Sequence, residues 1–259
     1  MKRALVTGAG KRLGRAMALY LAERGFDVAV HYATSSEGAD EVVTKIKGMG
    51  RQAVAVQADL LDLDAMEGLL PRAAKALGGP ITCLVNNASI FEYDNITSVT
   101  RDSWDRHINS NLRAPFVLSQ AMAAQGLRPD TDEAGEPIAV GLILNMLDQR
   151  VRKLTPEFMT YTLAKTALWS LTQTTAQALA PAIRVNAIGP GPTLQGSRQS
   201  QAHFEGQRAA TILKRGANPD DITAALGYFL DASSVTGQLL CVDGGQHLGW
   251  QTPDVLGIE

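Results

Sequence analysis

The sequence predicts an α/β protein, a single domain with a doubly wound parallel sheet of about seven strands and helices on both faces. First, short runs rich in β-branched residues alternate with longer amphipathic stretches, an order typical of right-handed β-α-β crossovers. Second, several of these runs are apolar throughout, as expected for strands covered on both faces. Third, a chain of 259 residues, 45% of them hydrophobic, can bury a sizeable core in one domain.

The expected elements follow from the period of the apolar residues. Short segments rich in Val, Ile, Leu and Ala are predicted to be strands. They are residues 3–7, 27–32, 53–57, 82–86, 139–145, 183–188 and 239–242. Longer segments place apolar residues three and four apart, the spacing of an amphipathic helix. They are residues 13–24, 39–49, 63–77, 101–124, 157–180 and 220–230.

Two longer connections contain turn residues in place of a periodic pattern. Residues 127–137 combine Pro, Asp, Glu and Gly and are predicted to form a surface loop before the fifth strand. Residues 189–200 are irregular and follow the sixth strand. Because ligands bind at the carboxyl ends of the strands in an open α/β sheet, the region 189–210 is predicted to cover the substrate. No repeat or low-complexity tract divides the chain, so residues 1–259 are predicted to form one domain.

Charge and cysteine content narrow the classes of function. The formal net charge of −2 gives no electrostatic basis for binding nucleic acid or an anionic membrane surface. The apolar run after the basic N-terminus breaks at Thr7, so we predict no signal peptide, and we find no segment long enough to span a bilayer. Cys83 and Cys241 lie in strand-like runs and are predicted to be buried thiols, which suits a cytoplasmic protein, whereas a zinc site needs more ligands.

The first predicted strand runs into a glycine-rich turn, residues 7–14, that opens a long helix. Glycines in such a turn let backbone amides and the helix N-terminus approach a pyrophosphate. A glycine-rich turn can also serve only to reverse the chain, but its position here favours dinucleotide binding. Arg12 stands where many such loops have a small residue, and it places a cation near the phosphates. The predicted cofactor contacts of the turn are Gly8, Lys11, Arg12, Leu13 and Gly14.

The end of the second predicted strand indicates which dinucleotide binds. An acidic residue there would bind the adenosine ribose diol and favour NAD, and the sequence has none. His31, Thr34 and Ser35 instead offer donors suited to a 2′-phosphate, which predicts NADP(H) as the cofactor. Arg12 adds a positive charge to the same pocket. The alternative is that His31 and Tyr32 only close the strand.

Polar residues after the third and fourth predicted strands extend this pocket. The carboxylate of Asp59 can accept a hydrogen bond from an adenine amino group. Asp59 can equally cap a helix that begins near Leu60. Phe91, after the fourth strand, offers an aromatic face to a ligand. The predicted cofactor contacts in these two segments are Asp59, Leu60, Asn87, Ala88 and Ser89.

Tyr161 and Lys165 lie four residues apart on a predicted helix, so both side chains project from one face, about 6 Å apart along its axis. An ammonium close to a phenol favours the phenolate, and Lys165 is therefore expected to lower the pKa of Tyr161 toward neutrality, as a general acid/base requires. Asp148, at the end of the preceding strand, adds a second proton carrier. Asn111 lies in an otherwise apolar helical face and must hydrogen-bond either a water beside Lys165 or a neighbouring backbone carbonyl.

Together these residues resemble the short-chain dehydrogenase/reductase superfamily over residues 2–245. The motifs that carry the resemblance are Thr7-Gly8…Gly14, Asn86-Asn87-Ala88, Asn111, Tyr161-x-x-x-Lys165 and Arg184-Val185-Asn186…Pro190-Gly191. Two positions depart from the superfamily pattern, because Arg12 replaces the second glycine and Asp148 replaces the catalytic serine of the fifth strand. Both departures, together with His31-Tyr32 and Phe91, resemble the pteridine reductases and the related dihydromonapterin reductases.

The resemblance implies a Rossmann-type fold, NADPH as hydride donor and a pterin as substrate. Hydride would pass to a ring C=N carbon of a dihydropteridine, while Tyr161, supplied by Asp148, protonates the adjacent nitrogen. Lys165 would bind the nicotinamide ribose and Asn111 would hold a relay water. The implied substrate contacts are Arg12, Ser89, Phe91, Asp148 and Tyr161. The further implied cofactor contacts are Met146, Tyr161, Lys165, Pro190 and Gly191.

Three classes of function stay open on the sequence. The first is an NADPH-dependent pteridine or dihydropteridine reductase, and the second is an NADP(H)-dependent reductase of another carbonyl or imine. The third is a dinucleotide sensor without catalysis, against which Tyr161 and Lys165 argue, since binding alone needs no tuned phenol. The resemblance also implies a homotetramer paired through the helices at 101–124 and 157–180. The apolar tail, residues 246–259 with Trp250, is predicted to pack at a subunit interface.

Overall fold

Seven parallel strands form the central sheet of the protein, in the order β3-β2-β1-β4-β7-β8-β9. The computed structural model describes residues 2–196, 199–252 and 255. The strands of this sheet are β1 (Arg3–Val6), β2 (Asp27–Tyr32), β3 (Ala53–Gln57), β4 (Cys83–Asn86), β7 (Gly141–Met146), β8 (Ile183–Pro190) and β9 (Leu239–Val242). The predicted α/β fold with a doubly wound, Rossmann-type parallel sheet is therefore confirmed.

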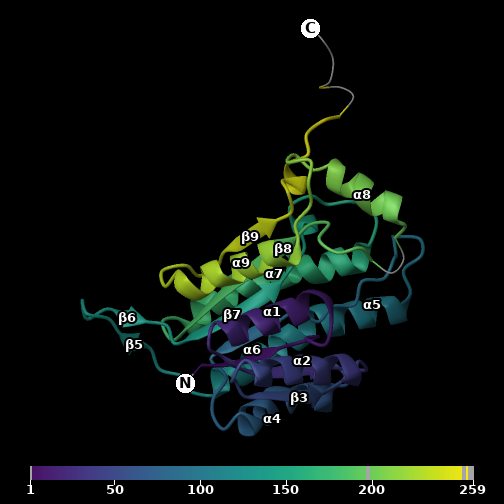
Figure 1. The fold of residues 1–259 in the computed structure, drawn as a ribbon. Coiled ribbons are helices and arrows are strands. Elements are labelled where there is room, and N and C mark those ends of the chain that lie inside the picture. The colour runs from purple at the N-terminus through teal and green to yellow at the C-terminus, as the bar shows by residue number, and fades with distance from the viewer. Residues whose placement is uncertain (1, 197–198, 253–254, 256–259) are drawn as a thin grey trace.

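Helices cover both faces of the sheet (Figure 1). The longer helices are α1 (Arg12–Glu23), α2 (Ser36–Gly48), α4 (Leu69–Ala76), α5 (Arg101–Ile108), α6 (Ala114–Ala124), α7 (Met159–Leu179), α8 (Gln201–Ala209) and α9 (Pro219–Asp231). The shorter ones are α3 (Leu63–Glu67), the π-helix η1 (Asn109–Arg113), and the 3₁₀ turns η2 (Gln149–Val151) and η3 (Gln246–Leu248). In Figure 1, α5 and α8 lie at the right of the molecule.

The two larger hydrophobic cores result from the alternation of side chains along the strands. Ala4 and Val6 of β1 pack in a core with residues of α1, α2 and α9, whereas Leu5 between them packs with residues of α3, α4 and α6 on the other face. Successive side chains of a strand point to opposite faces, so a strand buried on both sides must be apolar throughout. This explains why β1, β4 and β7 read as continuous apolar runs.

The strand order places the site at one edge of the sheet. β1 pairs with β2 on one side and with β4 on the other, so successive crossovers leave in opposite directions at this point. In open α/β sheets, ligands bind at such a switch point, outside the carboxyl ends of the strands. The carboxyl ends of β1, β2, β4 and β7 are each followed by residues that the sequence assigned to cofactor or catalysis.

Several predicted elements differ in the structure. The helix predicted at 63–77 is two helices, α3 and α4, and the one at 101–124 is interrupted by η1, a π-helix, which widens the turn. The loop predicted at 127–137 contains β5 (Asp130–Thr131), which pairs with β6 (Pro137–Ile138) in a ribbon that projects at the left of Figure 1. The sequence did not predict α8, because its few apolar residues follow no helical stripe and none is buried.

The predicted burial of the two cysteines is confirmed for one of them, and the predicted packing of the C-terminal tail is not tested. Cys83 is buried as expected, but Cys241 is only partly buried, since β9 is an edge strand of the sheet. Trp250 is 58% exposed in this single chain, and residues 253–254 and 256–259 of the tail lie outside the described residues. The packing of the tail at a subunit interface stays a prediction. None of the described helices is long and apolar enough to cross a membrane.

Replacing the buried Ile143 of β7 by alanine should lower the free energy of unfolding by about 2–5 kcal/mol, because it opens a cavity in the core below the site. The matched control is Ile96→Ala, at a side chain that is 74% exposed, which should change stability by less than about 0.5 kcal/mol. Urea unfolding of both variants measures the difference. Equal losses would contradict the assignment of Ile143 to the core.

Candidate active site

The helix α7 and the end of β7 bring the predicted catalytic residues together. The Tyr161 hydroxyl donates a hydrogen bond of 3.0 Å to Oδ2 of Asp148, which follows β7. Lys165, one turn further along α7, donates from Nζ to the backbone carbonyl of Met146 at 2.7 Å. Tyr161 and Lys165 are both buried. The structure thus places a phenol, a carboxyl and an ammonium close together at the end of β7, as the spacing of the motifs indicated.

The electrostatics of this trio correct one expectation. Burial raises the pKa of Tyr161 well above its ordinary value, and the charge of Asp148 and its hydrogen bond raise it further. Burial lowers the pKa of Lys165 to about 8, and its Nζ is fixed on the Met146 carbonyl. The prediction that Lys165 lowers the pKa of Tyr161 is therefore wrong for this arrangement. The group that faces the phenol oxygen is a carboxylate, so the phenol keeps its proton.

Asp148 is itself perturbed by its surroundings. Burial raises the pKa of Asp148, while the backbone amide and the charge of Arg150 oppose that shift. The Arg150 amide donates to Oδ1 of Asp148 at 2.8 Å, which fixes the carboxyl plane and leaves Oδ2 for Tyr161. A carboxyl and a phenol with raised pKa values in one hydrogen bond retain a proton at neutral pH, as a proton donor must.

The glycine-rich turn is packed tightly enough to require glycine at two positions. Gly8 has a φ of +63°, and a Cβ on Gly14 would lie 2.3 Å from the Gly8 carbonyl oxygen. The Thr7 hydroxyl anchors the turn to the segment after β4, because it accepts 2.9 Å hydrogen bonds from the amides of Asn87 and Ala88. α1 begins here without a side-chain cap on its first amides. Such a helix N-terminus suits a phosphate.

A cavity of about 380 Å³ extends from this turn across the ends of β2, β3 and β4. The predicted cofactor residues that line it are Gly8, Lys11, Arg12, Leu13, Gly14, His31, Tyr32, Ser35, Asp59, Leu60, Asn87, Ala88 and Ser89. The other lining residues are Gly10, Ala33, Thr34, Leu61, Ile90 and Ser110. The remaining predicted cofactor residues do not line it, so their contacts with the cofactor stay predictions; they are Met146, Tyr161, Lys165, Pro190 and Gly191.

His31 has a different role from the one predicted. Its Nδ1 accepts a hydrogen bond from the Gly8 amide at 3.0 Å, so Nε2 carries the proton and donates to the Ala58 carbonyl at 3.0 Å. Burial lowers the pKa of His31 to about 4, which leaves the ring neutral. The ring therefore has no donor for a 2′-phosphate. Instead it fixes the glycine-rich turn onto the end of β2, a contact that sequence spacing alone does not reveal.

Arg12 and Asp59 also make contacts within the protein. The guanidinium of Arg12 donates to the carbonyls of Gln195 and Leu194 at 2.8 and 3.1 Å, which links the turn to the predicted substrate region after β8. Its contact with substrate and cofactor phosphate stays a prediction. Asp59 accepts a hydrogen bond from the Leu61 amide, but the cap of the following helix is Asp62. The alternative capping role of Asp59 is therefore wrong, and its carboxylate lines the cavity.

Asn111 pairs with the backbone of the segment that follows β4. Its side chain accepts from the Ile90 amide at 3.0 Å and donates to the Ile90 carbonyl at 2.8 Å. Of the two partners that the sequence left open, a backbone carbonyl is the one observed. Asn111 belongs to η1, and single π-helical turns are common at functional sites.

Phe91 lies directly beside the catalytic phenol. Its ring stacks on Phe158, with centroids 4.3 Å apart, and meets the Tyr161 ring edge-on at 4.7 Å. Phe91 is still 43% exposed. A planar ligand next to Tyr161 would therefore meet an aromatic wall. Sequence reasoning missed Phe158, since an aromatic residue before a helix has no distinctive pattern.

The sequence and the structure of the chain are similar to those of known proteins. A family model described as enoyl-(acyl carrier protein) reductase matches residues 8–247. The structure is similar to FolM alternative dihydrofolate reductase 1 from Brucella suis in complex with NADP, with a TM-score of 0.90 and 42% identity over 98% of each chain. A short chain dehydrogenase from Burkholderia cenocepacia J2315 in complex with NADP has a TM-score of 0.85 and 34% identity, over 95% of this chain and 97% of that one.

Among curated proteins, the 3-oxoacyl-(acyl-carrier-protein) reductase FabG of Staphylococcus epidermidis is 32% identical over 95% of this chain and 99% of its own length. The chain belongs to the short-chain dehydrogenase/reductase superfamily. Membership in this superfamily accounts for the order of the motifs along the chain. It does not fix the substrate, because the similar superfamily members include reductases named for different substrates.

The depressed pKa of Lys165 gives a testable dependence of stability on pH. Below pH 8 the lysine is charged in both states, so the folded protein carries the full cost of burying the charge. As the pH rises from about 8 to 10.5, the folded state loses this proton before the unfolded state does. The wild type should therefore gain up to about 3 kcal/mol of stability relative to Lys165→Met over this window. Urea unfolding of both proteins across the window measures it, and parallel curves would refute it.

Proposed function

We propose that the protein is an NADPH-dependent reductase of a dihydropteridine. The reaction converts a ring C=N bond to CH–NH, with a hydride added to carbon, a proton added to nitrogen, and NADPH oxidised to NADP⁺. The observation that carries the proposal is the hydrogen bond between Tyr161 and the partly buried carboxyl of Asp148. Support for the substrate comes from FolM alternative dihydrofolate reductase 1, a protein named for the reduction of a pterin-containing compound.

The residues of the cavity fit the cofactor NADP(H). Amides of the turn at Gly8–Gly14 and the uncapped start of α1 suit the pyrophosphate. The end of β2 offers Thr34 and Ser35, and Lys11 lines the same cavity, so these residues provide donors for a 2′-phosphate. Bound in this cavity, NADPH would supply the hydride. The similar structures from Brucella suis and Burkholderia cenocepacia contain NADP, which supports the same preference here.

The protein's own groups provide the proton. Tyr161 holds a proton on its hydroxyl because burial and Asp148 raise its pKa, and it can transfer this proton to a ring nitrogen beside it. A proton that Asp148 takes up from solvent after this transfer can pass to the phenolate through their hydrogen bond, which restores the phenol. Lys165 lies with its Nζ 5.7 Å from the Tyr161 ring centroid and on the Met146 carbonyl, and we expect it to bind the nicotinamide ribose. A carboxyl can in addition pair with amino and ring N–H groups of a pterin, which the serine usual in this superfamily does less well.

A reductase of another carbonyl is the second candidate. It is favoured by the likeness to 3-oxoacyl-(acyl-carrier-protein) reductase, which extends over 95% of the chain. Asp148 and the aromatic wall at Phe91 argue for the pterin instead, since a flexible oxoacyl chain needs neither a carboxyl nor a planar surface. A sensor without catalysis is disfavoured, because it would not need a buried Tyr161 with a dedicated carboxyl partner.

We also propose that the active protein is a cytoplasmic homotetramer. Large apolar side chains lie exposed on the helices expected to pair, namely Trp104 on α5, Phe116 on α6 and Leu163 on α7. Apolar groups of this size on one set of helices are typical of an interface between copies of a chain. The exposed Trp250 of the tail suits the same purpose.

The experiment that tests the function follows NADPH oxidation at 340 nm with dihydrobiopterin, dihydromonapterin, dihydrofolate and a 3-oxoacyl thioester. The wild type should turn over at least one dihydropterin with a higher kcat/KM than the thioester. In Asp148→Ser, kcat for the dihydropterin should fall by about 10²–10⁴-fold while NADPH binding is retained. A wild type that reduces the thioester and no pterin would overturn the proposal.

A second variant in the same assay separates a stacked ligand from a flexible one. Phe91→Ala should raise KM for the dihydropterin by about tenfold, since base-like stacking on an aromatic ring is worth about 1–3 kcal/mol. Turnover of any slow ketone substrate should change little. Equal effects on both would count against the aromatic wall as a pterin site.

A further inference from the structure

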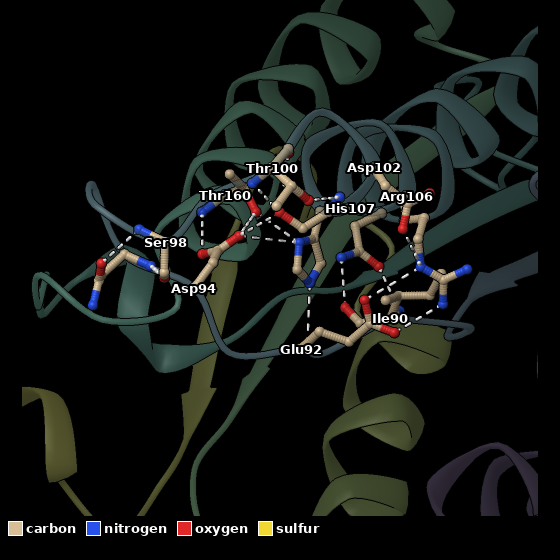
Figure 2. Close-up of polar contacts among 12 residues, drawn as sticks. Ile90, Glu92, Asp94, Ser98, Thr100, Asp102, Arg106, His107 and Thr160 are labelled. Carbon is tan, nitrogen blue, oxygen red and sulfur yellow. Dashed lines mark hydrogen bonds and ion pairs between the residues drawn. The ribbon is translucent and has the colours of Figure 1, made fainter.

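The catalytic helix α7 begins without a cap of its own. Its first flanking residue, Phe158, has a φ of +54° and gives no side-chain hydrogen bond to the helix. Asp94, from the segment after β4, supplies the missing acceptors (Figure 2). Its backbone carbonyl accepts from the Met159 amide at 3.3 Å, and its Oδ1 accepts from the Thr160 amide at 3.0 Å. A carboxylate at this end of a helix is favourable because it satisfies free amides and opposes the helix dipole.

His107 of α5 completes this buried network. Its Nε2 accepts from the Glu92 amide at 3.1 Å, so Nδ1 must carry the proton and donate to the Thr160 hydroxyl at 2.7 Å. The Thr160 hydroxyl in turn donates to Oδ2 of Asp94. Burial lowers the pKa of His107, which keeps the ring neutral and this direction of donation fixed. His107, Thr160 and Asp94 are all at most 1% exposed, so the network is shielded from water.

In the segment after β4, every second residue is held by hydrogen bonds, and the residues between them point to the other side. Ile90 is paired with Asn111, Glu92 with His107, and Asp94 with the start of α7. The residues between them, Phe91 and Tyr93, both contact the Phe158 ring, with centroids 4.3 and 5.3 Å apart. This is the alternation of an extended chain. One side therefore fixes the position of the segment, and the other side forms the aromatic wall next to Tyr161.

We infer that Asp94 is a positioning residue of the reaction, which caps α7 from another part of the chain and, with Thr160 and His107, fixes Tyr161 relative to the wall at Phe91. The expected effect on kcat rests on the proposed function, whereas the capping of α7 by Asp94 does not. Asp94 acts through Thr160, the residue directly before Tyr161, and its carboxylate is bonded to α7 and to Ser103 of α5. It is therefore not a proton donor to the substrate.

The test compares Asp94→Ala and Asp94→Asn with the wild type by hydrogen exchange and by kinetics. In Asp94→Ala, the peptide containing residues 158–165 should exchange at least about fivefold faster, because the first turn of α7 loses its cap. With a dihydropterin, kcat should fall by about 10–100-fold, since small displacements of a reacting group are costly. The Kd of NADPH, measured by fluorescence, should stay within about twofold of the wild type, since the cavity does not include Asp94.

Asp94→Asn keeps the carbonyl oxygen that accepts from the Thr160 amide, and it should recover most of kcat. The matched control is Asp62→Ala, which removes a capping aspartate from α3. It should speed exchange in α3 and leave both kcat and the exchange of residues 158–165 unchanged. These two variants separate a specific effect on Tyr161 from the loss of any helix cap.

The inference is overturned if folded Asp94→Ala shows wild-type exchange at residues 158–165 or a kcat within about twofold of the wild type. If Asp94→Ala does not fold, Thr160→Val decides, because it removes the hydroxyl that joins Asp94 to His107. Faster exchange at residues 158–165 with a reduced kcat supports the inference, and wild-type exchange with an unchanged kcat overturns it. Absence of any pterin turnover by the wild type would contradict the proposed function instead. The exchange measurement needs no substrate and still tests the cap in that case.

Discussion

The hydrogen bond from Tyr161 to the carboxyl of Asp148 joins the centre of the sheet to the catalytic helix, and the proposed chemistry depends on it. Asp148 follows β7, which lies between β4 and β8 in the sheet, and its side chain is partly buried. Burial raises the pKa of both partners, so that each keeps its proton to a higher pH than the same group would in water. A partly buried carboxyl beside a phenol suits protonation of a nitrogen.

The two sides of the site are built in different ways. On the cofactor side, backbone contacts dominate, because Gly14 packs on the Gly8 carbonyl and His31 and Thr7 hold the turn to the neighbouring strands. On the substrate side, an extended segment is anchored at every second residue and presents Phe91 to the pocket. A rigid backbone cradle serves a cofactor of fixed shape, whereas an aromatic wall with an exposed face leaves room for substrates of one planar class.

Much of the fold and the catalytic pocket could be predicted from the sequence, because strand period and motif spacing are local properties. The same reasoning could place Tyr161 and Lys165 on one helix face but could not see that Nζ is held by the Met146 carbonyl. It assigned His31 to a phosphate because the ring partners, Gly8 and Ala58, are distant in sequence. The network of Asp94 and Thr160 spans 66 residues, although the spacing of His107 one turn before Asn111 was a signal that could have been used.

The central claim is that Asp148 is a carboxyl with a raised pKa that shares a proton with Tyr161. The most direct test is carbon NMR of protein labelled at aspartate carboxyls, with the Asp148 signal assigned by its absence in Asp148→Asn. The account predicts that this signal titrates above the ordinary pKa of an aspartate, and that Tyr161→Phe changes its midpoint. A carboxyl that titrates at or below the ordinary aspartate pKa, unaffected by Tyr161→Phe, would contradict the account.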